Sequence, residues 1–142
     1  MKTVALILRD HRDELWQSWA AGLHDEVADD YHELIASQVG QHIVRGLTDD
    51  FVACSEAEPY ELAGLYRQVE ERVAGEAASR IRLGFERMDV VRALQAVRGA
   101  AVDVLIDAMA AGEMPSFADT LFQLRAVDDL LDALVRAVWT AA

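Results

Sequence analysis

The stretch Ala77–Ile106 constrains the fold of this chain most strongly, because it has the pattern of two amphipathic helices joined by a tight break. Gly84 and Phe85 stand at the break, and glycine readily adopts the left-handed conformation that ends a helix. Asp89 precedes two valines and belongs to the residue types that cap helices, so we expect the second helix to begin there. The stretch therefore predicts a helical hairpin.

Two arginines fall inside the apolar arcs of this hairpin. On a helical wheel, Arg98 lies among apolar residues that include Leu94. Arg80 lies in line with Val73 and Ala77 of the preceding helix. A charge in an apolar stripe must be paired or must extend into water, because an isolated buried charge is strongly unfavourable. Both a structural ion pair and a role in ligand binding or signalling fit this pattern.

The rest of the chain also favours helices. Apolar residues make up 53% of the 142 residues but aromatic residues only 7%, a composition typical of an all-α fold. Pro59 and Ser116 are residue types that start helices. Apolar positions at helical spacing predict about five antiparallel helices in a single domain of residues 1–142, at residues 3–22, 31–52, 59–83, 89–111 and 116–139.

The last predicted helix carries Asp128 in its apolar arc. We therefore expect Asp128 to contact Arg98, Arg80 or both in a largely buried ionic cluster, because a lone buried charge is unstable. Glu76 is a competing partner, since it lies one turn before Arg80 in the favourable Glu-to-Arg order.

Charge and composition exclude several classes of partner. The net charge of −12, from 25 acidic and 13 basic residues, argues against binding to nucleic acid or to an anionic membrane. The single cysteine, Cys54, excludes an internal disulfide and fits a reducing cytoplasm. The N-terminal apolar run is too short for a signal peptide, and no run approaches the ~20 residues of a membrane helix. We therefore expect a cytoplasmic protein.

No pattern of catalytic or metal-binding residues stands out. The four histidines lack the spacing of helical metal sites, and neither a catalytic triad nor a glycine-rich phosphate loop is present. We expect neither enzyme activity nor a bound metal or other cofactor.

His42 supports one alternative. With Arg45 and Gly46 it resembles the His-x-x-Lys/Arg-Gly signature of histidine phosphotransfer domains, which are acidic helical bundles of about this size. In those domains an exposed imidazole accepts the phosphoryl group as a nucleophile, a basic residue steadies it, and a small residue leaves access. Here Leu47 and Thr48 replace the small polar residues that usually follow, so a phosphotransfer module remains the alternative reading.

A second resemblance covers roughly residues 5–110. Trp19 near the end of the first predicted helix and Tyr31 at the start of the second contribute to it. Its main part is the motif Ser79-Arg80-x-x-x-Gly84-Phe85-x-x-x-Asp89-Val90-Val91-x-Ala93-Leu94-x-x-x-Arg98. On these residues the chain resembles the N-terminal sensor domain of the stressosome co-antagonist proteins, the RsbR/RsbRD N-terminal family, related copies of which precede histidine kinase modules.

The resemblance implies a globin-like helical domain that lacks haem, dimerises and conveys an input to a C-terminal signalling module of the anti-anti-sigma or kinase type. No such module follows here, so we expect an excised sensor or a stand-alone protein that acts through a partner protein. The predicted function is that of a non-catalytic bacterial signalling domain, which senses or relays a stress or ligand signal through helix rearrangement.

Apolar surface independently favours a homodimer. The last predicted helix ends in Val138 and Trp139 with little polar cover, and the second predicted helix is apolar over a wide arc. Together they leave more apolar surface than one small bundle easily buries.

Overall fold

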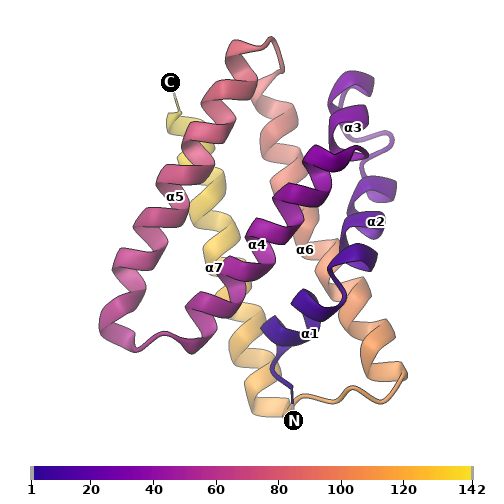
Figure 1. The fold of residues 1–142 in the computed structure, drawn as a ribbon, viewed down its shortest axis with the longest axis vertical. Coiled ribbons are helices and arrows are strands. Elements are labelled where there is room, and N and C mark those ends of the chain that lie inside the picture. Colours follow the sequence, from indigo (N-terminus) through magenta and orange to yellow (C-terminus); the bar gives the residue numbers. More distant parts are fainter. Residues whose placement is uncertain (1, 142) are drawn as a thin grey trace.

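The computed structural model describes residues 2–141, and every regular element in that range is an α-helix (Figure 1). The helices are α1 (Val4–Asp10), α2 (Arg12–Gly22), α3 (Asp29–Ile35), α4 (Gln38–Glu56), α5 (Pro59–Arg82), α6 (Arg87–Ala110) and α7 (Phe117–Thr140). The predicted all-α class is confirmed, but the described residues form seven helices instead of about five. No helix among them is long and apolar enough to cross a membrane.

The first predicted helix, at residues 3–22, is interrupted at a single residue. His11 has φ −107° and ψ 28°, which takes the backbone out of the helical region between α1 and α2. Its imidazole lies 2.5 Å from a carboxylate oxygen of Glu113, in the turn between α6 and α7. Two helices thus replace the predicted one, and a contact distant in sequence holds the residue at the break.

The second predicted helix, at residues 31–52, is also divided. α3 ends at Ile35, and Ser37 caps α4 because its side chain accepts a hydrogen bond from the Val39 amide. Gly40 makes the close approach of the two helices possible, since a Cβ there would lie 1.7 Å from the Ile35 carbonyl oxygen. The division depends on a glycine that the apolar pattern does not reveal.

The predicted hairpin is present as α5 and α6. Gly84 has φ 104°, and its amide donates to the Ile81 carbonyl at 3.0 Å. The Phe85 amide donates to the Arg80 carbonyl at 3.1 Å, which completes a Schellman motif. This pair of bonds ends α5 and reverses the chain, as the sequence predicts.

Asp89 does not cap the second helix of the hairpin. α6 begins two residues earlier, at Arg87, and Asp89 lies in its first turn. The side chain is buried, and one carboxylate oxygen accepts from the Ala28 amide at 3.4 Å. Asp89 therefore supports the start of α3 from a neighbouring helix instead of starting its own.

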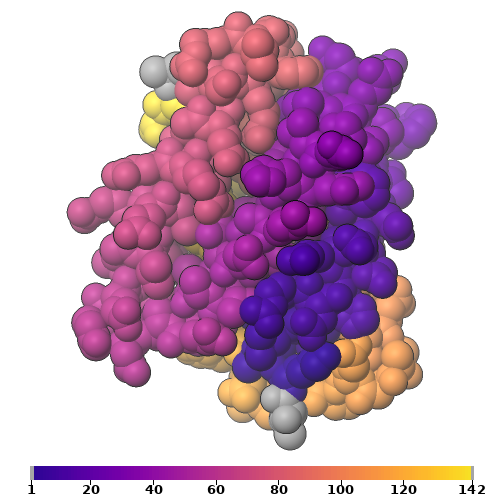
Figure 2. All heavy atoms as spheres, in the orientation of Figure 1, coloured from indigo at the N-terminus to yellow at the C-terminus, as the bar shows by residue number. Residues whose placement is uncertain are grey.

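The helices pack in two layers (Figure 1). α7 lies between α5 and α6 and packs against both, and α4 passes in front of α7 in this view. α1 packs on α4, and α2 packs on α6. Figure 2 shows the face on which α4 and α5 meet, with α1 beside them. The core between the layers is built mainly from Val, Leu, Ile and Ala side chains.

Candidate functional site

The candidate site is a pocket of about 160 Å³ where α4, α5 and α6 meet, with one residue each from α2 and α3. Its apolar walls are formed by Ile43, Leu47, Val73, Val90, Ala93 and Leu94. Its polar lining includes Arg80 and Glu76 from the predicted ionic cluster, and His42 and Gly46 from the phosphotransfer alternative. The structure therefore brings residues of two separate predictions into one place.

Arg80 provides the least exposed positive charge of this lining. Only 15% of its side chain is exposed, and one guanidinium nitrogen lies 3.7 Å from a carboxylate oxygen of Glu76. Glu76 also lies 3.8 Å from the guanidinium of Arg72. The Glu76 carboxylate thus lies between two arginines. Arg80 shares this carboxylate with Arg72, and its ion pair to Glu76 is long.

Tyr31 places a hydroxyl group beside Arg80. The ring is buried and packs edge-on against Phe85, with 5.3 Å between the ring centroids. Burial raises the pKa of the Tyr31 hydroxyl above its ordinary value of 10.0, although the adjacent Arg80 acts in the opposite direction. The phenol is therefore protonated at neutral pH and can donate a hydrogen bond. Arg80 and Phe85 of the hairpin motif both act on this one side chain.

Trp19 forms a fixed wall of the pocket. It is buried, and its indole nitrogen donates to the Ala93 carbonyl at 2.7 Å. Trp16, one turn earlier, donates in the same way to the Ile35 carbonyl at 2.8 Å. Each indole donor already has a partner, so both tryptophans act as anchors between helices.

His42 and Arg45 are exposed on α4, and Gly46 lies one turn beyond His42. A Cβ at Gly46 would lie 3.8 Å from a guanidinium nitrogen of Arg72, which is an ordinary contact distance. Arg72 forms two hydrogen bonds to Asp50, and these raise the pKa of the Arg72 guanidinium. The basic group nearest to Gly46 is thus already paired.

The predicted, largely buried ionic cluster around Asp128 does not form, and Arg80 instead contacts its competing partner Glu76. Arg98 contacts Asp128 at 2.7 Å, as one of the predicted pairings has it, and also Asp132 at 3.4 Å. However, 52% of the Arg98 side chain and 44% of the Asp128 side chain are exposed, so the expected burial is wrong. Arg80 pairs with Glu76 on its own helix. Asp128 lies on the outer side of α7, so the two ion pairs are separate.

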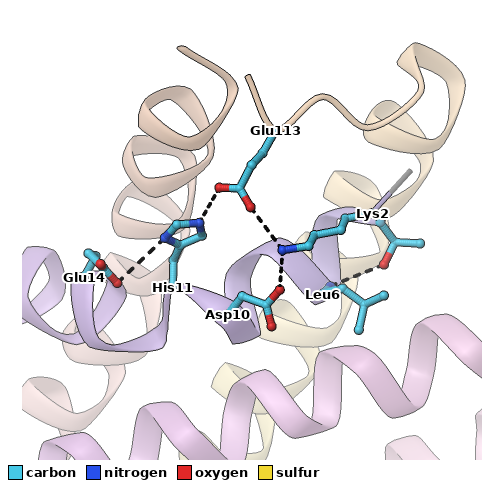
Figure 3. Close-up of polar contacts among 7 residues, drawn as sticks. Lys2, Leu6, Asp10, His11, Glu14 and Glu113 are labelled. Atoms are coloured by element: carbon cyan, nitrogen blue, oxygen red, sulfur yellow. Dashed lines mark hydrogen bonds and ion pairs between the residues drawn. The ribbon is translucent and has the colours of Figure 1, made fainter. Parts of the chain in front are cut away.

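A second polar cluster joins the N-terminal segment 2–14 to the turn after α6 (Figure 3). Glu113 lies between His11 and Lys2, and Lys2 also contacts Asp10 at 2.8 Å. Hydrogen bonds from His11 and Lys2 lower the pKa of Glu113. Sequence reasoning missed this cluster, because no local pattern links residues about a hundred positions apart.

Comparison of the chain with protein-family models, with curated proteins and with solved structures finds no match. The resemblance to the RsbR/RsbRD N-terminal family therefore stays a prediction. Among residues 2–141, no three histidine, cysteine or carboxylate side chains gather in a way that could hold a metal ion.

Proposed function

We propose that this chain is a non-catalytic signalling domain that binds a small molecule in the pocket beside Arg80 and relays its presence through a movement of helices. The observation that carries this proposal is that the largely buried Arg80 guanidinium and the Tyr31 hydroxyl both line a pocket whose walls are mainly apolar. Ligand sites commonly combine apolar walls with a few polar groups that fix orientation. The volume of about 160 Å³ suits a molecule near the size of benzene.

The relay follows from which helices line the pocket. Five helices, α2 to α6, contribute to its walls, so a bound ligand is surrounded by all five of them. α6 supplies Leu94 to the pocket, and one turn later it supplies Arg98 to the contact with α7. A ligand that favours one position of α6 over another therefore shifts the population of α6–α7 arrangements. Dimerisation through this pair of helices would pass the change to a partner protein or module in the cytoplasm.

A thermal-shift screen of small metabolites tests ligand binding. A compound at one hundred times its dissociation constant adds about 2.7 kcal/mol to the free energy of unfolding. That corresponds to a rise in Tm of roughly 5 °C or more for a domain of this size. The Arg80→Met variant keeps the apolar stem and should lose the shift, whereas Arg45→Met, an exposed control, should retain it. The proposal fails when no compound stabilises the wild type, or when the shift persists in Arg80→Met.

Phosphotransfer through His42 is the second candidate function. It is favoured by the exposure of His42 on α4, with Gly46 one turn away and Arg45 exposed between them. Incubation with acetyl phosphate or with a kinase should then label the wild type and leave His42→Gln unlabelled. An unlabelled wild type, or equal labelling of both proteins, would remove this candidate.

A further inference from the structure

α7 carries two apolar stripes on different sides. The inner stripe faces the core and consists of the buried residues Val127, Leu130, Leu131, Leu134 and Val138. The outer stripe consists of Phe117, Leu121, Leu124, Asp128, Val135 and Trp139. In the outer stripe Phe117 is 80% exposed, Leu121 is 56% exposed and Trp139 is 51% exposed. Three large apolar side chains thus lie on a surface that the rest of residues 2–141 leaves largely uncovered.

The outer stripe is nearly symmetric about Asp128, and only Leu124 has no apolar counterpart, because Asp132 lies at the equivalent position on the other side. Phe117 and Trp139 each lie eleven residues from Asp128, and Leu121 and Val135 each lie seven residues from it. Neighbouring members of the stripe are three, four or seven residues apart, the spacing of a seam between packed helices. Two copies that meet in opposite directions therefore place four apolar positions of the stripe opposite apolar positions of the partner, and Leu124 opposite the partner's Asp132.

We propose that a second copy of this chain docks on the outer stripe, with the two α7 helices antiparallel and a two-fold axis beside Asp128. In this arrangement Phe117 packs on the partner's Trp139, and Leu121 packs on the partner's Val135. Each contact occurs twice, as an isologous two-fold interface requires. The inference deepens the dimerisation step of the proposed function and rests on it, but it does not depend on the pocket.

Charge distribution favours this face for contact between two acidic chains. Residues 87–142 carry 5 basic and 8 acidic side chains, so they account for only −3 of the net charge of −12. Asp128 already has Arg98 at 2.7 Å, so each copy brings a paired aspartate to the axis. Arg98 also contacts Asp132 at 3.4 Å, so two arginines and four carboxylates lie beside the axis. A polar residue at one position of an apolar seam also fixes register, because any slipped alignment buries it against apolar side chains.

The neighbouring surface of α6 enlarges the face. The contact between Arg98 and α7 orients α6, and Val102 and Ile106 follow one and two turns beyond Arg98. Val102 is 38% exposed and Ile106 is 59% exposed. Together with the outer stripe they present on the order of 600 Å² of apolar surface per copy, close to the ~800 Å² that each partner buries in a standard interface. Polar side chains around Arg98 supply the remaining area of such an interface.

Sedimentation equilibrium on the full chain tests the interface. The wild type should behave as a dimer of 15.7 kDa subunits at micromolar concentration. Leu121→Glu should raise the dimer dissociation constant by about 100-fold or more, because the change removes two central contacts at once. Phe122→Glu is the matched control, since Phe122 is 75% exposed on the same helix but lies outside the stripe. Circular dichroism should show the same helix content in all three proteins.

Cysteine cross-linking tests the direction of the helices. In a Cys54→Ser background, Asp128→Cys should cross-link to itself across the axis. Phe117→Cys should not, because its two copies would lie about 33 Å apart along antiparallel helices. An equal mixture of Phe117→Cys and Trp139→Cys proteins should give the mixed dimer.

Each contrary result overturns a defined part of the proposal. A wild type that stays monomeric overturns both this interface and the dimerisation step of the proposed function. A dimer that Leu121→Glu does not weaken overturns the interface and leaves that step standing. Self-cross-linking of Phe117→Cys overturns the antiparallel arrangement. None of these results bears on ligand binding in the pocket, which the thermal-shift screen measures independently.

Discussion

Replacing Gly40 by alanine should destabilise the domain strongly, although alanine is the better helix former. The added Cβ would lie 1.7 Å from the Ile35 carbonyl oxygen and 2.5 Å from its carbonyl carbon. Ordinary contacts between such atoms begin at about 3.5 Å, so one of the two helices must move by more than an ångström. The carbonyl cannot move freely, because it accepts the hydrogen bond from the Trp16 indole at 2.8 Å.

The size of the effect follows from three contributions. Forcing an extra carbon into a packed contact costs about 1–3 kcal/mol, and losing the Trp16 hydrogen bond costs about 1–2 kcal/mol more. Alanine in a helix returns at most ~1 kcal/mol relative to glycine. The net loss for Gly40→Ala is therefore about 1–4 kcal/mol, and each kcal/mol lowers Tm by roughly 2–4 °C in a domain of this size.

Gly64→Ala is the matched control. A Cβ at Gly64 meets nothing within 4 Å, and the residue lies in the interior of α5. The same substitution should there stabilise the domain by about 0.5–1 kcal/mol. Thermal unfolding followed by circular dichroism measures both changes. Equal stabilisation by Gly40→Ala and Gly64→Ala would show that α3 and α4 do not approach at Gly40, and the reasoning about the divided helix would be wrong.

Three further outcomes follow from single contacts. Arg98→Ala, measured at a concentration where the chain is monomeric, should change the free energy of unfolding by less than about 1 kcal/mol, because its ion pairs are exposed. Trp19→Phe should cost about 1–3 kcal/mol in urea unfolding, since it removes the buried hydrogen bond from the indole to the Ala93 carbonyl and part of a buried ring. Because the pKa of Glu113 is lowered in the fold, its ionised form contributes its full stabilisation at pH values above 4.5, the ordinary pKa of the group. This stabilisation disappears as the pH falls through the lowered pKa. Glu113→Gln should therefore flatten the dependence of Tm on pH in the acid range, and an unchanged dependence would contradict the contact with His11.

Local signals in the sequence were sufficient for most helix boundaries in the second half of the fold, the start of α6 excepted. Pro59 begins α5 and Ser116 caps α7, and both boundaries were predicted from residue types that start helices. Gly84 ends the first arm of the hairpin as predicted, because its conformation is set by its own backbone freedom. Such features depend on a few neighbouring residues, so a single sequence reveals them.

The first half required information that is not local. The break at His11 is accompanied by its contact with Glu113, and the break before α4 depends on how closely Gly40 approaches Ile35. Neither contact can be recognised before the helices are placed. The candidate site shows the same limit. The apolar pattern singled out Arg80, but the role of Tyr31 beside it appears only when α3 packs near the end of α5.

The misplacement of Asp128 has a physical cause that also supports the proposed interface. A helical wheel shows only which residues share a direction, and it cannot say which direction faces the core. α7 is apolar in two directions, so Leu121 and Val135 made the arc that contains Asp128 resemble a core-facing stripe. The structure assigns the core to the other stripe and leaves Phe117, Leu121 and Trp139 of this arc at the surface, with Leu124 and Val135 partly buried at the edge of the core. A monomer gains no burial from the exposed Phe117, Leu121 and Trp139, whereas two copies that bury them against each other gain the transfer free energy of that surface. The predicted burial of Asp128 within one chain is therefore wrong, and the burial that we infer for this arc is between two molecules.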